Sequence, residues 1–150
     1  MNFEERINEE LKNAIKMQDK IRIETLRSIR SSIIEFNKSG AGRELNLEDE
    51  IKILQAQAKK RKDAIEVYEK AHRNDLLERE EKELAIIQEF LPKQLSESEV
   101  TEIVKKIIIE VGAKDLKDLG KVMSKAMKDL KGKVDGSLVQ KIVKDVLSRE

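Results

Sequence analysis

The sequence predicts an all-α fold, and three features of its composition lead to that prediction. Charged residues make up 41% of the 150 residues, aromatic residues only 3%, and there is a single proline. A chain so rich in Ala, Leu, Ile, Glu, Lys and Arg, and so poor in turn residues, is typical of helical proteins. Apolar residues make up 39% and recur with helical spacing, so we expect ordered helices rather than a disordered chain.

Residues 1–91 are predicted to form an amino-terminal layer of helical hairpins. Asn2, Asp19 and Asn46 have the side chains and positions expected of helix caps for the first three helices. A break at residues 72–74 is expected before the fourth helix. The predicted inward-facing residues of the first, second and fourth helices are Phe3, Ile7, Leu11, Ala14, Ile15, Leu26, Ile29, Ile33, Phe36, Leu77, Leu84, Ile87 and Leu91.

The third predicted helix carries a coiled-coil-like face, which we call the heptad face. Its residues are separated alternately by four and three positions, and they are Leu47, Ile51, Leu54, Ala58, Arg61, Ile65 and Tyr68. Arg61 stands where an apolar residue is due, so we expect it to pair with a carboxylate, Asp63 and Glu66 being among the local candidates. The heptad face is also a candidate surface for a protein partner.

Residues 92–150 are predicted to form a carboxy-terminal bundle of three short helices. Pro92 ends the preceding layer because it disfavours helix at the residue before it and cannot donate a backbone hydrogen bond. The predicted caps of the three helices are Ser96, Asp115 and either Asp135 or Ser137. The predicted core comprises Val100, Ile103, Val104, Ile107, Ile108, Val111, Leu116, Leu119, Met123, Ala126, Met127, Leu130, Leu138, Val139, Ile142, Val143, Val146 and Leu147.

The residue types exclude several kinds of chemistry. The chain has no cysteine, which excludes disulfides, thiolate catalysis and cysteine-based zinc sites. The single histidine, His72, is interpreted as a solvated residue at a helix end. The sequence has no nucleophile elbow, no complete phosphate-binding loop and no pair of histidines with metal-ligand spacing. We therefore predict no catalytic residue, no metal and no cofactor.

The location of the protein is predicted from the absence of membrane and export signals in the sequence. No apolar run approaches the roughly 20 residues that a membrane span needs. The first residues, Met1 to Glu5, are too acidic for the start of a signal peptide. We expect a cytoplasmic protein that does not contact a membrane.

The charge balance does not by itself indicate a nucleic-acid partner. There are 31 basic and 30 acidic residues, so a nucleic-acid surface depends on the local placement of Lys and Arg. A lysine stripe on the second predicted tail helix is poorly neutralised, because Asp118 and Asp129 are its only acids after the cap. The stripe and the loop after it contain Lys117, Lys121, Lys125, Lys128, Lys131 and Lys133.

A second basic arrangement lies in the first predicted hairpin. Arg27 and Arg30 are three residues apart on one helix face, and Arg22 is close enough to extend it. These arginines and the tail lysines are our candidate RNA-binding residues, because cations at this spacing can contact phosphates without reading bases. The alternative interpretation is that both arrangements are ordinary solvated helix faces.

Short motifs occur along the whole chain in a specific order. They are Asp19-Lys20, Leu26-Arg27, Lys59 to Asp63 with Ile65, Glu69-Lys70-Ala71 with Arg73, Asp75 and Leu76, Leu91-Pro92, Gln94-Leu95-Ser96, Gly120-Lys121-Val122-Met123, and Gly132 to Gly136 with Val139 and Val143. In this order they resemble the YqeY family. The last third of the chain is also similar to the tail domain of the B subunit of the tRNA-dependent amidotransferases (GatB). His72 departs from the family pattern, which often has glycine at this position.

The resemblance implies an all-helical fold of two units and a role in holding tRNA, which the amidotransferase tail domain helps to do. It implies RNA-backbone contacts for Lys121, Lys125 and Lys128. Labels of the family mention carbon–nitrogen ligation with glutamine as amide donor, but this chain lacks the catalytic cradle of the amidotransferase. We expect a tRNA- or RNA-binding protein without catalysis of its own. The alternatives are a protein-interaction adaptor and an accessory component of a glutamine-dependent tRNA amidotransferase.

Overall fold

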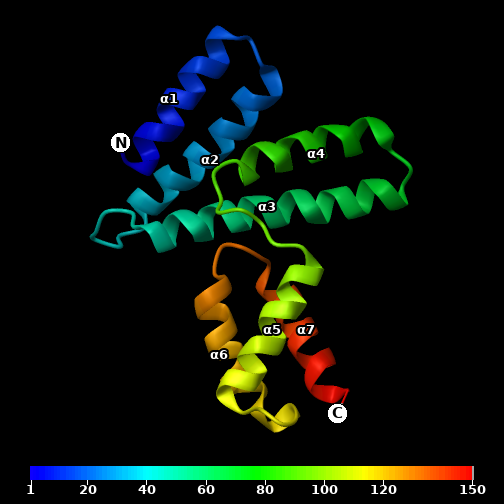
Figure 1. Cartoon of the computed structure of the whole chain (residues 1–150). Coiled ribbons are helices and arrows are strands. Elements are labelled where there is room, and N and C mark those ends of the chain that lie inside the picture. Colours follow the sequence, from blue (N-terminus) through cyan, green and yellow to red (C-terminus); the bar gives the residue numbers. More distant parts are fainter. Residues whose placement is uncertain (150) are drawn as a thin grey trace. The chain divides into compact units, whose positions relative to one another are not determined.

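The computed structural model describes residues 1–149, and this part of the chain is all-helical (Figure 1). It contains seven α-helices, one 3-10 helix and, among the described residues, no strand. The elements are α1 (Phe3–Lys16), α2 (Lys20–Lys38), α3 (Leu47–Lys70), α4 (Asn74–Gln88), α5 (Glu97–Val111), the 3-10 helix η1 (Leu116–Asp118), α6 (Leu119–Leu130) and α7 (Gly136–Ser148). The prediction of an all-α fold is confirmed.

Residue contacts divide the chain into two compact units, with the boundary between Leu91 and Pro92. Helices α1 to α4 belong to the amino-terminal unit, and α5 to α7 with η1 belong to the tail unit. Each unit has a hydrophobic core built from its own residues.

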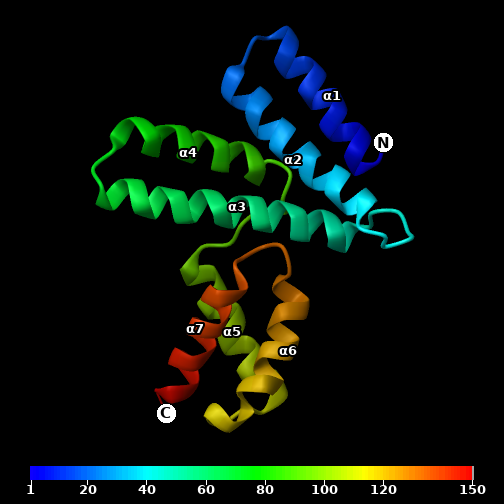
Figure 2. The same ribbon diagram turned by 180° about the vertical axis from the view of Figure 1, so that it is seen from behind.

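The amino-terminal unit consists of two pairs of consecutive helices. Helix α1 packs against α2, α3 packs against α4, and α2 joins the pairs by contacting both α3 and α4 (Figures 1 and 2). Its buried core comprises Phe3, Ile7, Leu11, Ala14, Leu26, Ile29, Ile33, Leu54, Ala58, Ile87 and Leu91. Burying these side chains is the main favourable term available to a unit of this size.

The three predicted caps of this unit are confirmed. The side chains of Asn2, Asp19 and Asn46 each accept a hydrogen bond from a backbone N–H three residues ahead. Asn2 and Asn46 form complete capping boxes, which satisfy amides that the first helical turn leaves without partners. The helix starts are therefore set by local sequence.

His72 is exposed between α3 and α4, as predicted for a helix-end residue. Its φ angle is 55°, in the left-handed region that favours glycine. This conformation gives a physical reason for a glycine at this position in proteins that the chain resembles, because glycine adopts it without steric cost.

Two predicted core residues of the amino-terminal unit are exposed instead. Ile15 is 49% exposed in the last turn of α1, and Leu47 is 70% exposed as the first residue of α3. The apolar spacing continues to the end of a helix. A side chain at the end is nevertheless less covered, because further turns of its helix lie on one side of it only. Helix α4 likewise ends at Gln88, although Leu91 is still buried in the turn that follows.

The tail unit is formed by α5, α6 and α7, each of which packs against the other two. Its buried core contains only apolar residues, namely Val100, Val104, Ile107, Val122, Ala126, Leu130, Val134, Val139, Ile142, Val143 and Leu147. The predicted capping box of Ser96 and Glu99 is confirmed. Asp135 caps α7 by accepting from the backbone N–H of Ser137, which decides between the two predicted caps.

The start of α6 differs from the prediction. Asp115 caps η1, a 3-10 helix, and α6 begins only at Leu119. The tighter 3-10 geometry changes the phase of the side chains that precede α6. Leu116, in η1, is 50% exposed. Within α6, Met127 is 37% exposed, while Val122, which was not predicted in the core, is fully buried.

Candidate polyanion-binding surface

Three of the predicted RNA-contacting lysines share one side of α6. Lys121, Lys125 and Lys128 are four and three residues apart, so they lie along one stripe of the helix. Helix α6 turns its buried residues to the opposite side, and these are Val122, Ala126 and Leu130. We call these three lysines the α6 lysine ridge. Lys117 precedes α6, in η1, so the name does not include it.

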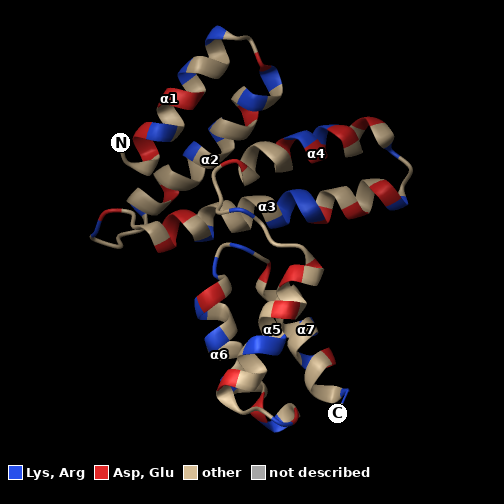
Figure 3. Ribbon diagram, in the orientation of Figure 1, with Lys and Arg blue, Asp and Glu red and all other residues tan. Residues whose placement is uncertain are grey.

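The three lysines of the ridge differ in how they are neutralised. The Lys125 ammonium lies 3.2 Å from an Asp129 carboxylate oxygen, four residues along the same helix. Lys121 and Lys128 are exposed, and neither forms an ion pair within residues 1–149. The carboxylate of Asp118 accepts a hydrogen bond from the backbone N–H of Lys114. The uncompensated charge of the ridge therefore resides on Lys121 and Lys128. Figure 3 shows where basic and acidic residues occur along α6.

Lys131 and Lys133 lie in the turn between α6 and α7, and both side chains are exposed. The backbone of this turn is held in place from the start of α5. The Gln94 side-chain amide donates to the Gly132 carbonyl at 2.8 Å, and the Leu95 N–H donates to the Lys133 carbonyl at 2.9 Å. The two lysines thus extend from a fixed backbone.

The two predicted arginines lie on α2, in the amino-terminal unit. Arg27 and Arg30 are both exposed and three residues apart. Arg22 does not extend this pair, contrary to the prediction, because its guanidinium lies 2.8 Å from both Glu10 and Glu89. The hydrogen bond to Glu89 is the largest cause of the raised pKa of Arg22. The structure therefore separates the candidate residues into one group on α2 and one on or next to α6.

Arg61 is buried and paired with carboxylates, as predicted, but its partners are not the predicted ones. Its Nε atom lies 2.9 Å from Glu83 and 3.8 Å from Glu80, both on α4. The heptad face of α3 packs against α4, so the neighbouring helix supplies carboxylates that sequence spacing on α3 cannot reveal. Burial, followed by the charge of Glu83, raises the pKa of Glu80. Arg61 is therefore a structural residue rather than a phosphate ligand.

The heptad face is largely covered within the amino-terminal unit. Ile51, Leu54, Ala58 and Arg61 are buried, and Ile65 and Tyr68 are half-buried. A protein partner could reach this face only at its ends. The predicted adaptor surface therefore has a structural role along most of its length.

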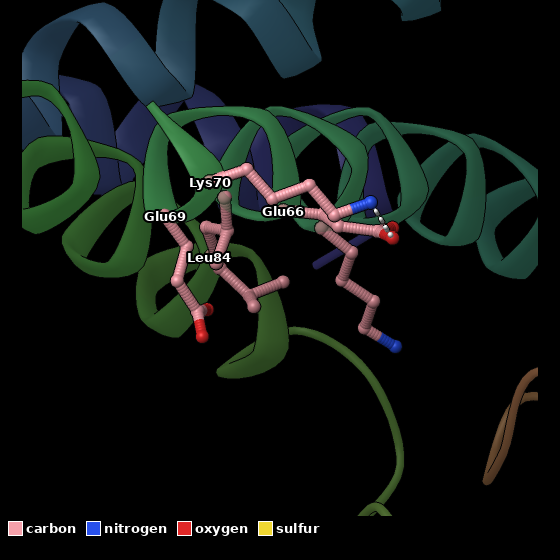
Figure 4. Close-up of a pocket in the computed structure, with 6 residues that line it drawn as sticks. Glu66, Glu69, Lys70 and Leu84 are labelled. Carbon is pink, nitrogen blue, oxygen red and sulfur yellow. Dashed lines mark hydrogen bonds and ion pairs between the residues drawn. The ribbon is translucent and has the colours of Figure 1, made fainter. Parts of the chain in front are cut away.

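Beside the carboxy-terminal part of that face lies a hollow that sequence analysis did not single out. It has a volume of about 330 Å³, and we call it the α3–α4 hollow (Figure 4). Its lining residues are Lys62, Ile65, Glu66, Glu69, Lys70 and Leu84. Figure 4 shows the ion pair that joins Lys70 to Glu66, at 3.3 Å, and the side chains of Glu69 and Leu84. The helical spacing of the α3 members was visible in the sequence, but the contribution of Leu84 from α4 was not.

Comparison with known proteins assigns the chain to a family. The model of the Yqey-like protein family matches residues 4–147. The chain belongs to the YqeY family. The resemblance that the ordered motifs indicated is thereby confirmed.

This YqeY-family chain is similar to several fungal proteins. It is 30% identical over 148 residues to altered inheritance of mitochondria protein 41, mitochondrial, of Pyrenophora tritici-repentis, covering 95% of this chain and 79% of that protein. It is 33% identical over 110 residues to a protein of the same name from Lachancea thermotolerans, covering 70% and 57%. An uncharacterized protein of Schizosaccharomyces pombe is 36% identical over 95 residues, covering 63% and 76%.

The names of two of these YqeY relatives place those proteins in mitochondria. A cytoplasmic location of the present chain therefore stays a prediction. Among residues 1–149, no helix is both long and apolar enough to cross a membrane.

Proposed function

We propose that this YqeY-family protein binds structured RNA, with tRNA as the expected ligand, through the α6 lysine ridge. The observation that carries the proposal is the exposure of Lys121 and Lys128 on the side of α6 opposite its buried residues, without ion pairs in the described chain. The resemblance of the tail to the tRNA-holding domain of the amidotransferase supports tRNA as the ligand. The activity proposed is binding, without catalysis by this chain.

The ridge suits a phosphate backbone better than a single small anion. From Lys121 to Lys128 the helix rises about 10 Å, a length that covers several charges of a nucleic acid. Lys125 can join the contact at small cost, because an exposed ion pair such as that with Asp129 contributes little in water. Binding of this kind depends on charge and shape and leaves base sequence unread.

Measurement of tRNA binding over a range of salt concentrations tests the proposal. Each lysine–phosphate contact steepens the dependence of log affinity on log salt by roughly 0.7 to 0.9. We expect the double variant Lys121→Glu/Lys128→Glu to bind tRNA about tenfold or more weakly, with a salt dependence shallower by roughly 1.5. A single-stranded RNA of equal length should bind the wild-type protein less tightly than tRNA does.

A matched control uses two exposed lysines of α5 in the same unit. Lys105→Glu/Lys106→Glu changes the net charge by the same amount away from the ridge. We expect this control to retain most of the affinity. Equal losses in the two double variants, or an affinity independent of salt, would contradict binding at the ridge.

A further inference from the structure

The α3–α4 hollow combines an apolar floor with a charged rim. Ile65 of α3 and Leu84 of α4 form the floor, and both are only half-buried. On the rim, Glu66 and Lys70 neutralise each other at 3.3 Å. The hollow therefore exposes apolar surface between the two helices that the unit's own side chains do not cover.

Two rim charges remain after the Glu66–Lys70 pair is accounted for. Lys62 and Glu69 both line the hollow, and neither forms an ion pair within residues 1–149. They are two helical turns apart on the same side of α3, with Ile65 between them. The rim thus presents one uncompensated cation and one uncompensated anion, about 10 Å apart along the helix axis.

This arrangement of one cation and one anion can pair with the same arrangement on a second copy of the chain. When a second α3 runs antiparallel about a two-fold axis between positions 65 and 66, Lys62 of each copy faces Glu69 of the other. The same operation places Ile65 of one copy near Ile65 of the other, so the two floors cover each other. A two-fold axis makes both contacts at once, because the same patch is used by both copies.

We propose that a second copy of this chain docks on the α3–α4 hollow, forming a two-fold dimer held by reciprocal Lys62–Glu69 pairs over Ile65 and Leu84. The hollow is small, and compact contacts of this size give weak association. The dissociation constant is therefore expected on the order of 0.1 mM, tighter at low salt because the rim charges are exposed. The residues of this contact are different from those of the α6 lysine ridge.

Sedimentation equilibrium of the full chain without RNA tests the dimer, from about 10 µM to about 1 mM protein at about 50 mM and about 500 mM salt. The Lys62→Glu variant places two carboxylates opposite each other at both contacts, and the Glu69→Lys variant places two ammonium groups there. Each single variant is expected to dimerise at least tenfold more weakly than the wild type. In an equimolar mixture of the two variants, each heterodimer has a carboxylate opposite an ammonium group at both contacts, so the mixture is expected to associate about as well as the wild type.

The reciprocal charge exchange is the sharper test. The double variant Lys62→Glu/Glu69→Lys restores opposite charges at both contacts, with the sign of each position reversed. We expect it to recover the association that each single variant loses. Because the double variant has the same net charge as the wild type, its recovery cannot be attributed to a change in overall charge.

A charge change on α3 outside the hollow serves as the control, and two results would overturn the proposal. Lys52→Glu makes the same charge change on α3 outside the hollow, and it is expected to leave association unchanged. A wild-type chain that stays monomeric up to about 1 mM at low salt overturns the proposal. So does a double variant that associates no better than the single variants. Circular dichroism of each variant establishes that it has retained its helices.

Discussion

The two units of this molecule use their charged residues in opposite ways. The amino-terminal unit buries Asp49, Arg61 and Glu83, whereas the buried core of the tail unit contains only apolar residues. In the first unit, cations are held against carboxylates of neighbouring helices, as Arg22 is by Glu10 and Glu89. In the tail, Lys121 and Lys128 face solvent and form no ion pair with any of residues 1–149. The chain as a whole is almost neutral, but its acidic residues do not neutralise all basic residues equally. It can therefore present a basic ridge.

The difference has a physical consequence for what each unit can do. A buried pair such as Arg61–Glu83 specifies how helices pack, because a misplaced partner leaves a desolvated charge. Exposed lysines contribute little to stability and are therefore available to a ligand. We expect substitutions of the buried charged residues to affect folding, and substitutions of the exposed lysines of the ridge to affect binding.

The largest expected effect comes from removing one partner of the buried pair. Glu83→Gln leaves the Arg61 guanidinium buried with the more distant Glu80 as its remaining carboxylate among the described residues, so we expect a loss of about 3 kcal/mol in the free energy of unfolding. Urea denaturation followed by circular dichroism measures this change. The double variant Arg61→Met/Glu83→Leu removes both charges and is expected to recover most of the loss. A Glu83→Gln variant as stable as the wild type would contradict the structural role assigned to this pair.

A smaller effect is expected in the apolar core of the tail, where it tests the phase of α6. Val122 is fully buried and Met127 is 37% exposed. Val122→Ala should reduce the free energy of unfolding by about 2 kcal/mol, because it leaves a cavity. Met127→Ala should cost less than about 1 kcal/mol. Thermal and urea denaturation of both variants provide the comparison, and the reverse order would contradict the side of α6 that the structure buries.

The smallest expected effect is a change with pH in the free energy of unfolding, caused by the carboxyl group of Glu80. Burial raises the pKa of Glu80, so its protonated form favours the folded state. The stability that protonation provides is present below the ordinary pKa of a glutamate and is lost as pH rises through the raised value. Glu80→Gln mimics the protonated form. Its stability relative to the wild type should therefore increase from about pH 4 to about pH 7. Denaturant midpoints at the two pH values measure the change, and a relative stability that falls with rising pH would contradict it.

Local features of the structure followed from the sequence, while features that depend on packing between helices did not. The caps at Asn2 and Ser96 involve residues three positions apart, so their side-chain types were sufficient to predict them. Pairing of Arg61 was predicted from its position on an apolar face. Its actual partner, Glu83, lies on another helix and is fixed only by the packing of α3 on α4.

The same distinction applies to the candidate surface. The stripe formed by Lys121, Lys125 and Lys128 was predicted from helical spacing, and the structure places all three on one side of α6. Lys117 was assigned to the stripe by extending the same spacing through the 3-10 segment, where the rise and twist per residue differ. The ion pairs that Arg22 forms with Glu10 and Glu89 could not be predicted from the sequence either. Glu89 is far from Arg22 along the chain and is brought next to it only by the fold.

The hydrogen bonds from Gln94 and Leu95 to the turn after α6 have one more consequence. They anchor the far end of the ridge helix to the entrance of α5, so the main chain beneath the lysines is already ordered before any ligand arrives. Only the lysine side chains would have to give up rotational freedom on meeting a phosphate chain. A preorganised support of this kind lowers the entropic penalty of association, which allows a few cations to hold a large polyanion.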